Sequence, residues 1–122
     1  MLERIANVVI SLNCTTSVFL NELLNDASSY TNNEREGVKK LNFLMMGVYI
    51  ESNNYLKKAF YYGDSNKAVK DEFLNKINYR MKQIHKLAQE HKGDKNYNNI
   101  NSYCNEYYKA IKSLISKLDR IY

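Results

Sequence analysis

The sequence contains no proline and no tryptophan, and only four glycines and two cysteines occur among its 122 residues. Sandwiches and barrels need many tight turns, which glycine and proline supply, so the scarcity of both residues argues against these folds. The hydrophobic content of 44% and the charged content of 25% are close to globular averages, which excludes a wholly disordered chain. We therefore predict an all-α protein with a few long helices and short connections.

The two cysteines, Cys14 and Cys104, are too few for a disulfide framework in a chain of this length. Each lies on or beside an apolar stripe, so we expect both to be small core residues. The apolar run at residues 8–12 is too short for a signal peptide, and no run approaches the ~20 apolar residues that cross a membrane. These features predict a cytoplasmic protein without a membrane partner.

Apolar residues recur at alternating steps of three and four in four segments, at residues 2–23, 38–62, 69–88 and 97–121. This spacing is the period of a helix with one buried face. The second stripe, for example, includes Leu41 and Met45 and ends at Tyr62. Four helices of similar length suit an antiparallel, up-and-down four-helix bundle. We expect residues 1–122 to form a single domain of this kind.

Residues that favour helix ends lie between these segments. Thr31, with Glu34 three positions later, has the pattern of a capping box at the start of the second helix. Gly63 and Gly93 follow the second and third stripes, where glycine readily takes the left-handed conformation that ends a helix. The sequence therefore predicts the helix boundaries as well as the helices.

The net charge of +5 is unevenly distributed. Residues 1–36 carry two basic and five acidic side chains, whereas residues 37–122 carry sixteen basic and eight acidic ones. Residues 76–86 contain four basic side chains and no acidic one, and Lys82 and Lys86 lie opposite the apolar stripe of their segment. Such segregation indicates an anionic partner, the alternative being an ordinary solvated face.

A single strand of nucleic acid fits this surface, because lysine and arginine neutralise phosphates and Tyr79 offers a ring on which an unpaired base can stack. Lys109 and Lys112 extend the surface to the fourth helix. The predicted nucleic-acid-binding residues are Lys76, Tyr79, Arg80, Lys82, Lys86, Lys109 and Lys112.

Catalysis and metal binding are weakly indicated. Arg80 and His85 have the Arg-x4-His spacing of helical ribonucleases of the HEPN type, in which histidine acts on a ribose hydroxyl and arginine steadies phosphate charge. A separation of five residues, however, places the two side chains ~140° apart on a helix. Neither His85 nor His91 follows a glutamate at the spacing of a di-iron bundle. We expect no catalytic residue, no metal site and no cofactor, and keep the ribonuclease as an alternative.

Three strings in the middle of the chain carry a family resemblance. Residues 42–48 (NFLMMGV), the turn at Gly63 and Asp64, and residues 78–88 (NYRMKQIHKLA) follow one another in an order similar to that of the C-terminal helical bundle of the large subunit in type I-B CRISPR interference complexes. That bundle also occurs as a separate small subunit. Residues 14–17 (CTTS), 60–62 (FYY) and 103–104 (YC) are similar to the type III small subunit.

The resemblance implies a non-catalytic helical subunit of an RNA-guided ribonucleoprotein complex. It further implies several copies that stack beside the guide-bearing backbone, and a target or displaced single strand held by basic side chains. The partners would then be other subunits, further copies of the chain, and single-stranded DNA or guide RNA. A different interpretation is a phage or plasmid inhibitor or immunity protein that binds an acidic protein surface through the same basic face.

Overall fold

The computed structural model describes residues 2–62 and 67–120, without the side chains of residues 2, 3 and 27. Within these ranges the chain forms four α-helices: α1 (Leu2–Asn25), α2 (Arg35–Tyr62), α3 (Lys67–Glu90) and α4 (Asn98–Asp119). Three short 3₁₀ helices lie in the connections: η1 (Ala27–Ser29) and η2 (Asn32–Glu34) before α2, and η3 (Lys95–Tyr97) before α4. The prediction of an all-α protein is confirmed.

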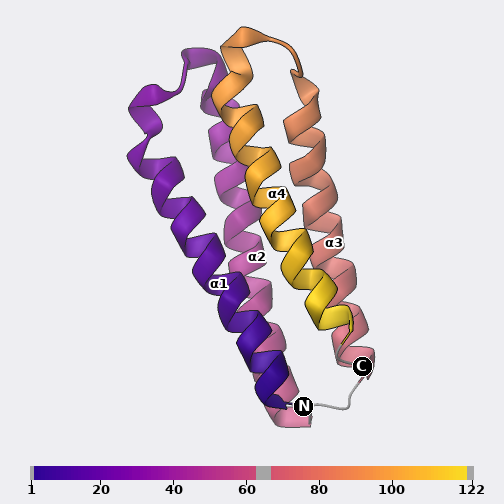
Figure 1. Cartoon of the computed structure of the whole chain (residues 1–122). Coiled ribbons are helices and arrows are strands. Elements are labelled where there is room, and N and C mark those ends of the chain that lie inside the picture. The colour runs from indigo at the N-terminus through magenta and orange to yellow at the C-terminus, as the bar shows by residue number, and fades with distance from the viewer. Residues whose placement is uncertain (1, 63–66, 121–122) are drawn as a thin grey trace.

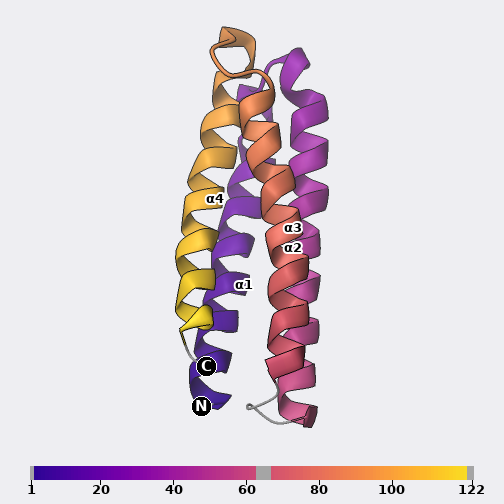
Figure 2. The ribbon, with the colours of Figure 1, turned by 90° about the vertical axis from the view of Figure 1, so that its right-hand side faces the viewer.

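The helices run alternately up and down, and each packs against the next in the chain (Figure 1). α1 also packs against α4, which closes the ring of four (Figure 2). The start of α1 and the end of α4 consequently lie at the same end of the bundle, and η1, η2 and η3 lie at the other. This arrangement is the predicted up-and-down four-helix bundle, and it gives α3 two neighbours, α2 on one flank and α4 on the other.

The apolar stripes meet along the axis of the bundle. Phe19 of α1 contacts the rings of Tyr103 and Tyr107 edge-on, and the Tyr107 hydroxyl shares a 2.9 Å hydrogen bond with the Thr16 hydroxyl. Burial raises the pKa of Tyr107 well above its ordinary value of 10.0, so this hydroxyl keeps its proton. Most stripe positions are buried, as their spacing predicts. The fully enclosed side chains include Ile5, Leu12, Leu23, Leu41, Met45, Ile77, Met81, Ile84, Ile111 and Leu118.

Two burial predictions are wrong. Cys14 is exposed, because it lies two residues, or about 200° of helical rotation, from both Leu12 and Thr16 and therefore on the side away from the core, whereas Cys104 is buried as expected. Tyr62 is 60% exposed, because the last turn of α2, a helix of 28 residues, carries its side chains into solvent. Helical periodicity locates a stripe along a helix but does not reveal where the neighbouring helices stop covering it.

The capping box is confirmed, and its glutamate does more than the pattern predicts. Glu34 is only 1% exposed and accepts a 2.9 Å hydrogen bond from the backbone N–H of Thr31. Its second oxygen accepts a 2.6 Å hydrogen bond from the backbone N–H of Ile100, in the first turn of α4. Since Tyr97, the N-cap residue of α4, makes no side-chain capping bond, Glu34 caps this helix from a distant part of the chain.

The connection between α3 and α4 turns at Gly93, which has a φ of 87° as predicted for a helix-ending glycine. The corresponding prediction for Gly63 falls outside the described residues. Across the described part of the chain, no helix is both long and apolar enough to pass through a membrane.

Candidate nucleic-acid interface

α3 presents its polar side between α2 and α4. Its buried face consists of Phe73, Ile77, Met81 and Ile84, which pack into the core. Tyr79, Lys82 and Lys86 lie on the opposite side and are exposed, Tyr79 to 65%. The orientation predicted for these three side chains from the helical period is therefore confirmed.

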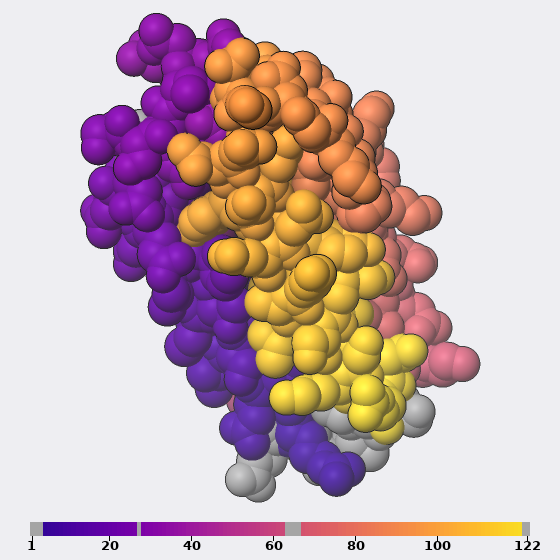
Figure 3. Space-filling model, turned by 45° about the horizontal axis from the view of Figure 1, so that its top comes forward, coloured from indigo at the N-terminus to yellow at the C-terminus, as the bar shows by residue number. Residues whose placement is uncertain are grey.

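A groove of about 540 Å³ runs between α3 and α4, and we call it the α3–α4 groove. It brings together three of the predicted residues, Tyr79 and Lys82 from α3 and Lys112 from α4. In the space-filling view the side chains of α3 project beyond the surface of α4 along this edge (Figure 3). The residues that line it are Asn75, Asn78, Tyr79, Met81, Lys82, Tyr108 and Lys112. Of the described residues, none that lines the groove is acidic.

The α4 side of this groove is organised around Tyr108. The Lys112 ammonium lies 5.9 Å from the centre of the Tyr108 ring and donates a long, 3.4 Å hydrogen bond to the Asn78 side-chain oxygen. The His85 ring lies 4.9 Å from the Tyr108 ring, between α3 and α4. Lys112 is thus held over the groove by neutral partners, which leave its charge uncompensated.

Lys109 is exposed on α4, three residues before Lys112 and on a neighbouring part of the helix surface. Lys86 lies on the side of α3 that faces α2 and lines a different groove, between these two helices. The seven predicted residues therefore do not form one patch. Lys82, Lys109 and Lys112 lie beside or within the α3–α4 groove, and Lys86 does not line it.

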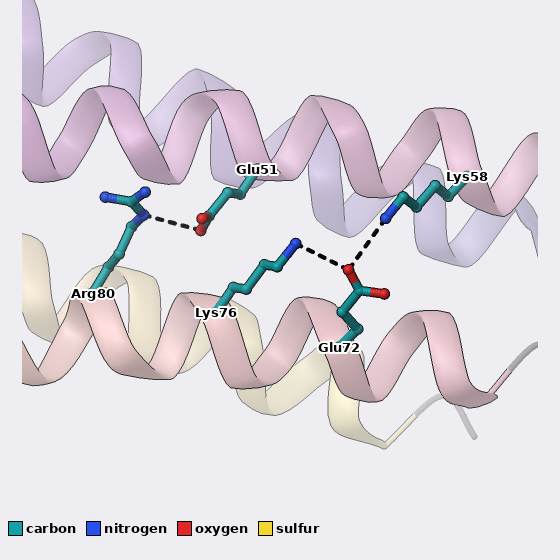
Figure 4. A network of polar contacts seen from close by, with 5 residues as sticks. All are labelled: Glu51, Lys58, Glu72, Lys76 and Arg80. Carbon is teal, nitrogen blue, oxygen red and sulfur yellow. Dashed lines mark hydrogen bonds and ion pairs between the residues drawn. The ribbon is translucent and has the colours of Figure 1, made fainter.

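Lys76 and Arg80 lie on the side of α3 that faces α2, and each contacts a carboxylate, the first from α3 itself and the second from α2 (Figure 4). Lys76 binds Glu72 at 2.9 Å, and the same carboxylate oxygen lies 3.2 Å from the Lys58 ammonium. This contact raises the pKa of Lys76 and lowers that of Glu72, because the hydrogen bond favours both charged forms. The charge of Lys76 is therefore shared with a carboxylate, which weakens it as a phosphate ligand.

Arg80 is inserted between α3 and α2. Its Nε lies 3.0 Å from a Glu51 carboxylate oxygen, close enough for an ion pair although the N–H is not aligned for a hydrogen bond. The guanidinium lies against the backbone of α2 at Gly47, where a Cβ atom would overlap it. Both charged side chains are largely covered, with exposures of 25% for Arg80 and 19% for Glu51. Arg80 thus serves the packing of α3 on α2.

The structure separates the two residues of the ribonuclease alternative. Arg80 contacts Glu51 on the α2 flank, whereas His85 contacts Tyr108 on the α4 flank. A shared substrate phosphate would therefore have to contact side chains on both flanks of α3. Over the described ranges there is also no group of three or more metal-binding side chains. Burial raises the pKa of Cys104 to about 12, so its thiol is protonated and unreactive at neutral pH.

Sequence reasoning did not identify Asn75, Asn78 or Tyr108 as parts of the site. Asn75 and Asn78 flank Tyr79 and Lys82 on the helix surface, at spacings of three and four residues, which is the signal that could have found them. Tyr108 lies four residues before Lys112 on α4. Its role depends on the packing of α4 beside α3, which periodicity alone does not specify.

Comparison of the chain with models of protein families, with curated proteins and with solved structures found no match.

Proposed function

We propose that the chain is a non-catalytic protein that binds single-stranded nucleic acid through the α3–α4 groove. The observation that carries the proposal is the pairing of Lys82 and Lys112 with a groove lining that, among the described residues, includes no carboxylate. An anionic backbone entering this groove meets positive charge without nearby repulsion. On the α2 flank, in contrast, Arg80 and Lys76 already form ion pairs with Glu51 and Glu72.

The groove supplies the two components that single-strand binding needs. Lys82 and Lys112 line the groove and Lys109 lies three residues before Lys112 on α4, so these lysines can contact phosphates of one strand, and each contact releases counterions from it. The exposed ring of Tyr79 stacks on a base, which tolerates any sequence because every base has a flat face. The long hydrogen bond from Lys112 to Asn78 is easily exchanged for a phosphate oxygen.

The resemblance to the helical small subunit of CRISPR effector complexes supplies a setting for this activity. In that setting the protein acts in the cytoplasm, as several copies within a ribonucleoprotein complex, and steadies the target or displaced strand. Weak affinity of one copy would suffice there, because neighbouring subunits raise the effective concentration of the strand.

The test is a salt titration of binding to a short fluorescent oligodeoxythymidine and to its RNA counterpart. The double variant Lys82→Glu/Lys112→Glu should bind the strand at least about tenfold more weakly, and its log–log salt slope should fall by about 1.4, which is two phosphate contacts. Mass measurement of the complex reports how many copies bind.

The matched control is Lys57→Glu/Lys117→Glu, which reverses two exposed lysines on α2 and α4 away from the groove. It changes the net charge by the same amount, so an equal loss of affinity in the two double variants would attribute binding to diffuse charge and contradict the proposal. Unchanged binding by the groove variant would contradict it as well.

A further inference from the structure

A second groove lies on the other flank of α3, between its last two turns and the start of α2, and has a volume of about 640 Å³. We call it the α2–α3 groove. Its walls combine apolar side chains, Phe43, Leu44 and Leu87, with three lysines, Lys39, Lys40 and Lys86. This combination differs from the amides and tyrosines of the α3–α4 groove.

The apolar part of the α2–α3 groove is accessible. Phe43 is 71% exposed, a high value for a phenylalanine, and Leu44 is half-buried beside it. Leu87 closes the floor from the α3 side. A partner that covers Phe43 and Leu44 removes apolar surface from water, which favours association by about 25 cal/mol per Å².

The rim of the α2–α3 groove is basic and largely uncompensated. Lys39 makes a loose ion pair with Glu36 at 3.6 Å, with both side chains exposed. For Lys40 and Lys86 the described residues provide no ion pair. The lining also includes one acidic side chain, Glu90, the last residue of α3. Its carboxylate lies 3.8 Å from the His91 ring nitrogen. The lining therefore has a positive balance around an apolar centre.

We propose that the α2–α3 groove binds an acidic amphipathic helix of a partner protein. Apolar residues of such a helix, spaced by three and four, cover Phe43 and Leu44, and its flanking carboxylates reach Lys39, Lys40 and Lys86. The charge complementarity selects an acidic helix over a neutral or basic one. Of the three apolar side chains that line the groove, Leu44 and Leu87 offer no stacking surface for bases. The groove therefore suits aliphatic side chains better than a nucleic-acid strand.

This site is independent of the proposed strand binding, because the two grooves share α3 but no lining residue. The probe is a synthetic helical peptide with leucine along one face and glutamate along the other, labelled for fluorescence anisotropy. Two companion peptides separate the contributions: one replaces the leucines by serine, and the other replaces the glutamates by lysine. Both companions should bind at least about tenfold more weakly than the parent peptide.

On the protein, Phe43→Ala and Lys40→Glu should each weaken binding of the parent peptide by about tenfold. Both side chains are exposed, so the fold is retained, which circular dichroism verifies. The controls are Ile50→Ala, an exposed apolar side chain of α2 that does not line the groove, and Lys109→Glu on α4. Both controls should bind the peptide like the unmodified protein.

The proposal is overturned if Phe43→Ala or Lys40→Glu binds the peptide normally, or if the serine-containing peptide binds as well as the parent. It is also overturned if an oligonucleotide displaces the peptide and Lys40→Glu weakens oligonucleotide binding as much as Lys82→Glu does, since the groove would then belong to the path of the strand. The Lys82→Glu/Lys112→Glu variant should retain peptide binding, so failure of one proposal is distinguishable from failure of the other.

Discussion

The two flanks of the middle part of α3 both carry cations, but these cations have different surroundings. On the α2 flank, Lys76 and Arg80 form ion pairs with Glu72 and Glu51, so their positive charges are compensated within the protein. On the α4 flank, Lys82 and Lys112 line a groove that, among the described residues, contains no carboxylate. Along this middle part of α3, the α2 flank holds two helices together and the α4 flank offers charge to a ligand.

The difference teaches that a count of lysines does not locate a binding surface. Lys76, Arg80 and Lys82 lie within seven residues of one another, but of the three only Lys76 has a glutamate four positions earlier. The coverage of Arg80 depends on Glu51 of α2, 29 positions before it, which helical spacing does not bring into view. Three changes break or sharpen this contrast.

The largest effect is expected from Glu51→Gln, which leaves the half-covered Arg80 guanidinium without its counter-charge. The free energy of unfolding should fall by about 1–2 kcal/mol, as measured by urea denaturation. Glu36→Gln is the control, because it breaks an ion pair whose members are both exposed, and it should cost about 0.5 kcal/mol or less. Equal losses in the two variants would show that the α2 flank is no more than a solvated surface.

A smaller effect is expected from Asn78→Asp, which gives a cation of the α4 flank, Lys112, a carboxylate partner like those on the α2 flank. The new carboxylate lies where Lys112 now donates to an amide, so it neutralises Lys112 and repels phosphate. Strand affinity should fall by about fivefold, a loss comparable to that of one phosphate contact. Asn54→Asp on α2 adds the same charge at a distance from the α3–α4 groove. If it weakens binding equally, the position of the charge is irrelevant and the contrast fails.

The smallest effect concerns the pH dependence of the exposed Lys58–Glu72–Lys76 contacts. Because these contacts lower the pKa of Glu72 below its ordinary value of 4.5, their stabilisation is complete above pH 4.5 and disappears as the pH falls through the lowered value. Urea midpoints of the unmodified protein and of Glu72→Gln should therefore differ slightly at pH 6 and converge in acid, and added salt should reduce the difference. Glu106→Gln, at an exposed position of α4, is the control for the loss of one negative charge, and an equal change of midpoint in both variants would contradict a specific role of the Glu72 contacts.

Periodicity was sufficient to predict the fold and the exposed side of α3, because one stripe of buried residues determines the orientation of every other side chain on a helix. It could not predict that Arg80 would be covered, since that depends on which residues of α2 lie opposite. The burial predicted for Cys14 was wrong for another reason, because a position two residues from Leu12 and from Thr16 lies on the opposite side of the helix from the stripe. The charge imbalance directed attention to the later helices, whereas the choice between the two grooves required the packing of α2 and α4.

The shared use of Glu34 has a consequence for the order in which the chain folds. The first turn of α4 obtains its cap from a residue 66 positions earlier, and Thr31 adds a 2.7 Å hydrogen bond to the carbonyl of Asn96. The first turn of α4 is therefore capped only once the connection before α2 is in place, which requires the long stretch of chain between Glu34 and Ile100 to close first. The two connections at this end of the bundle should consequently open together in hydrogen exchange, as one cooperative unit rather than as two separate loops.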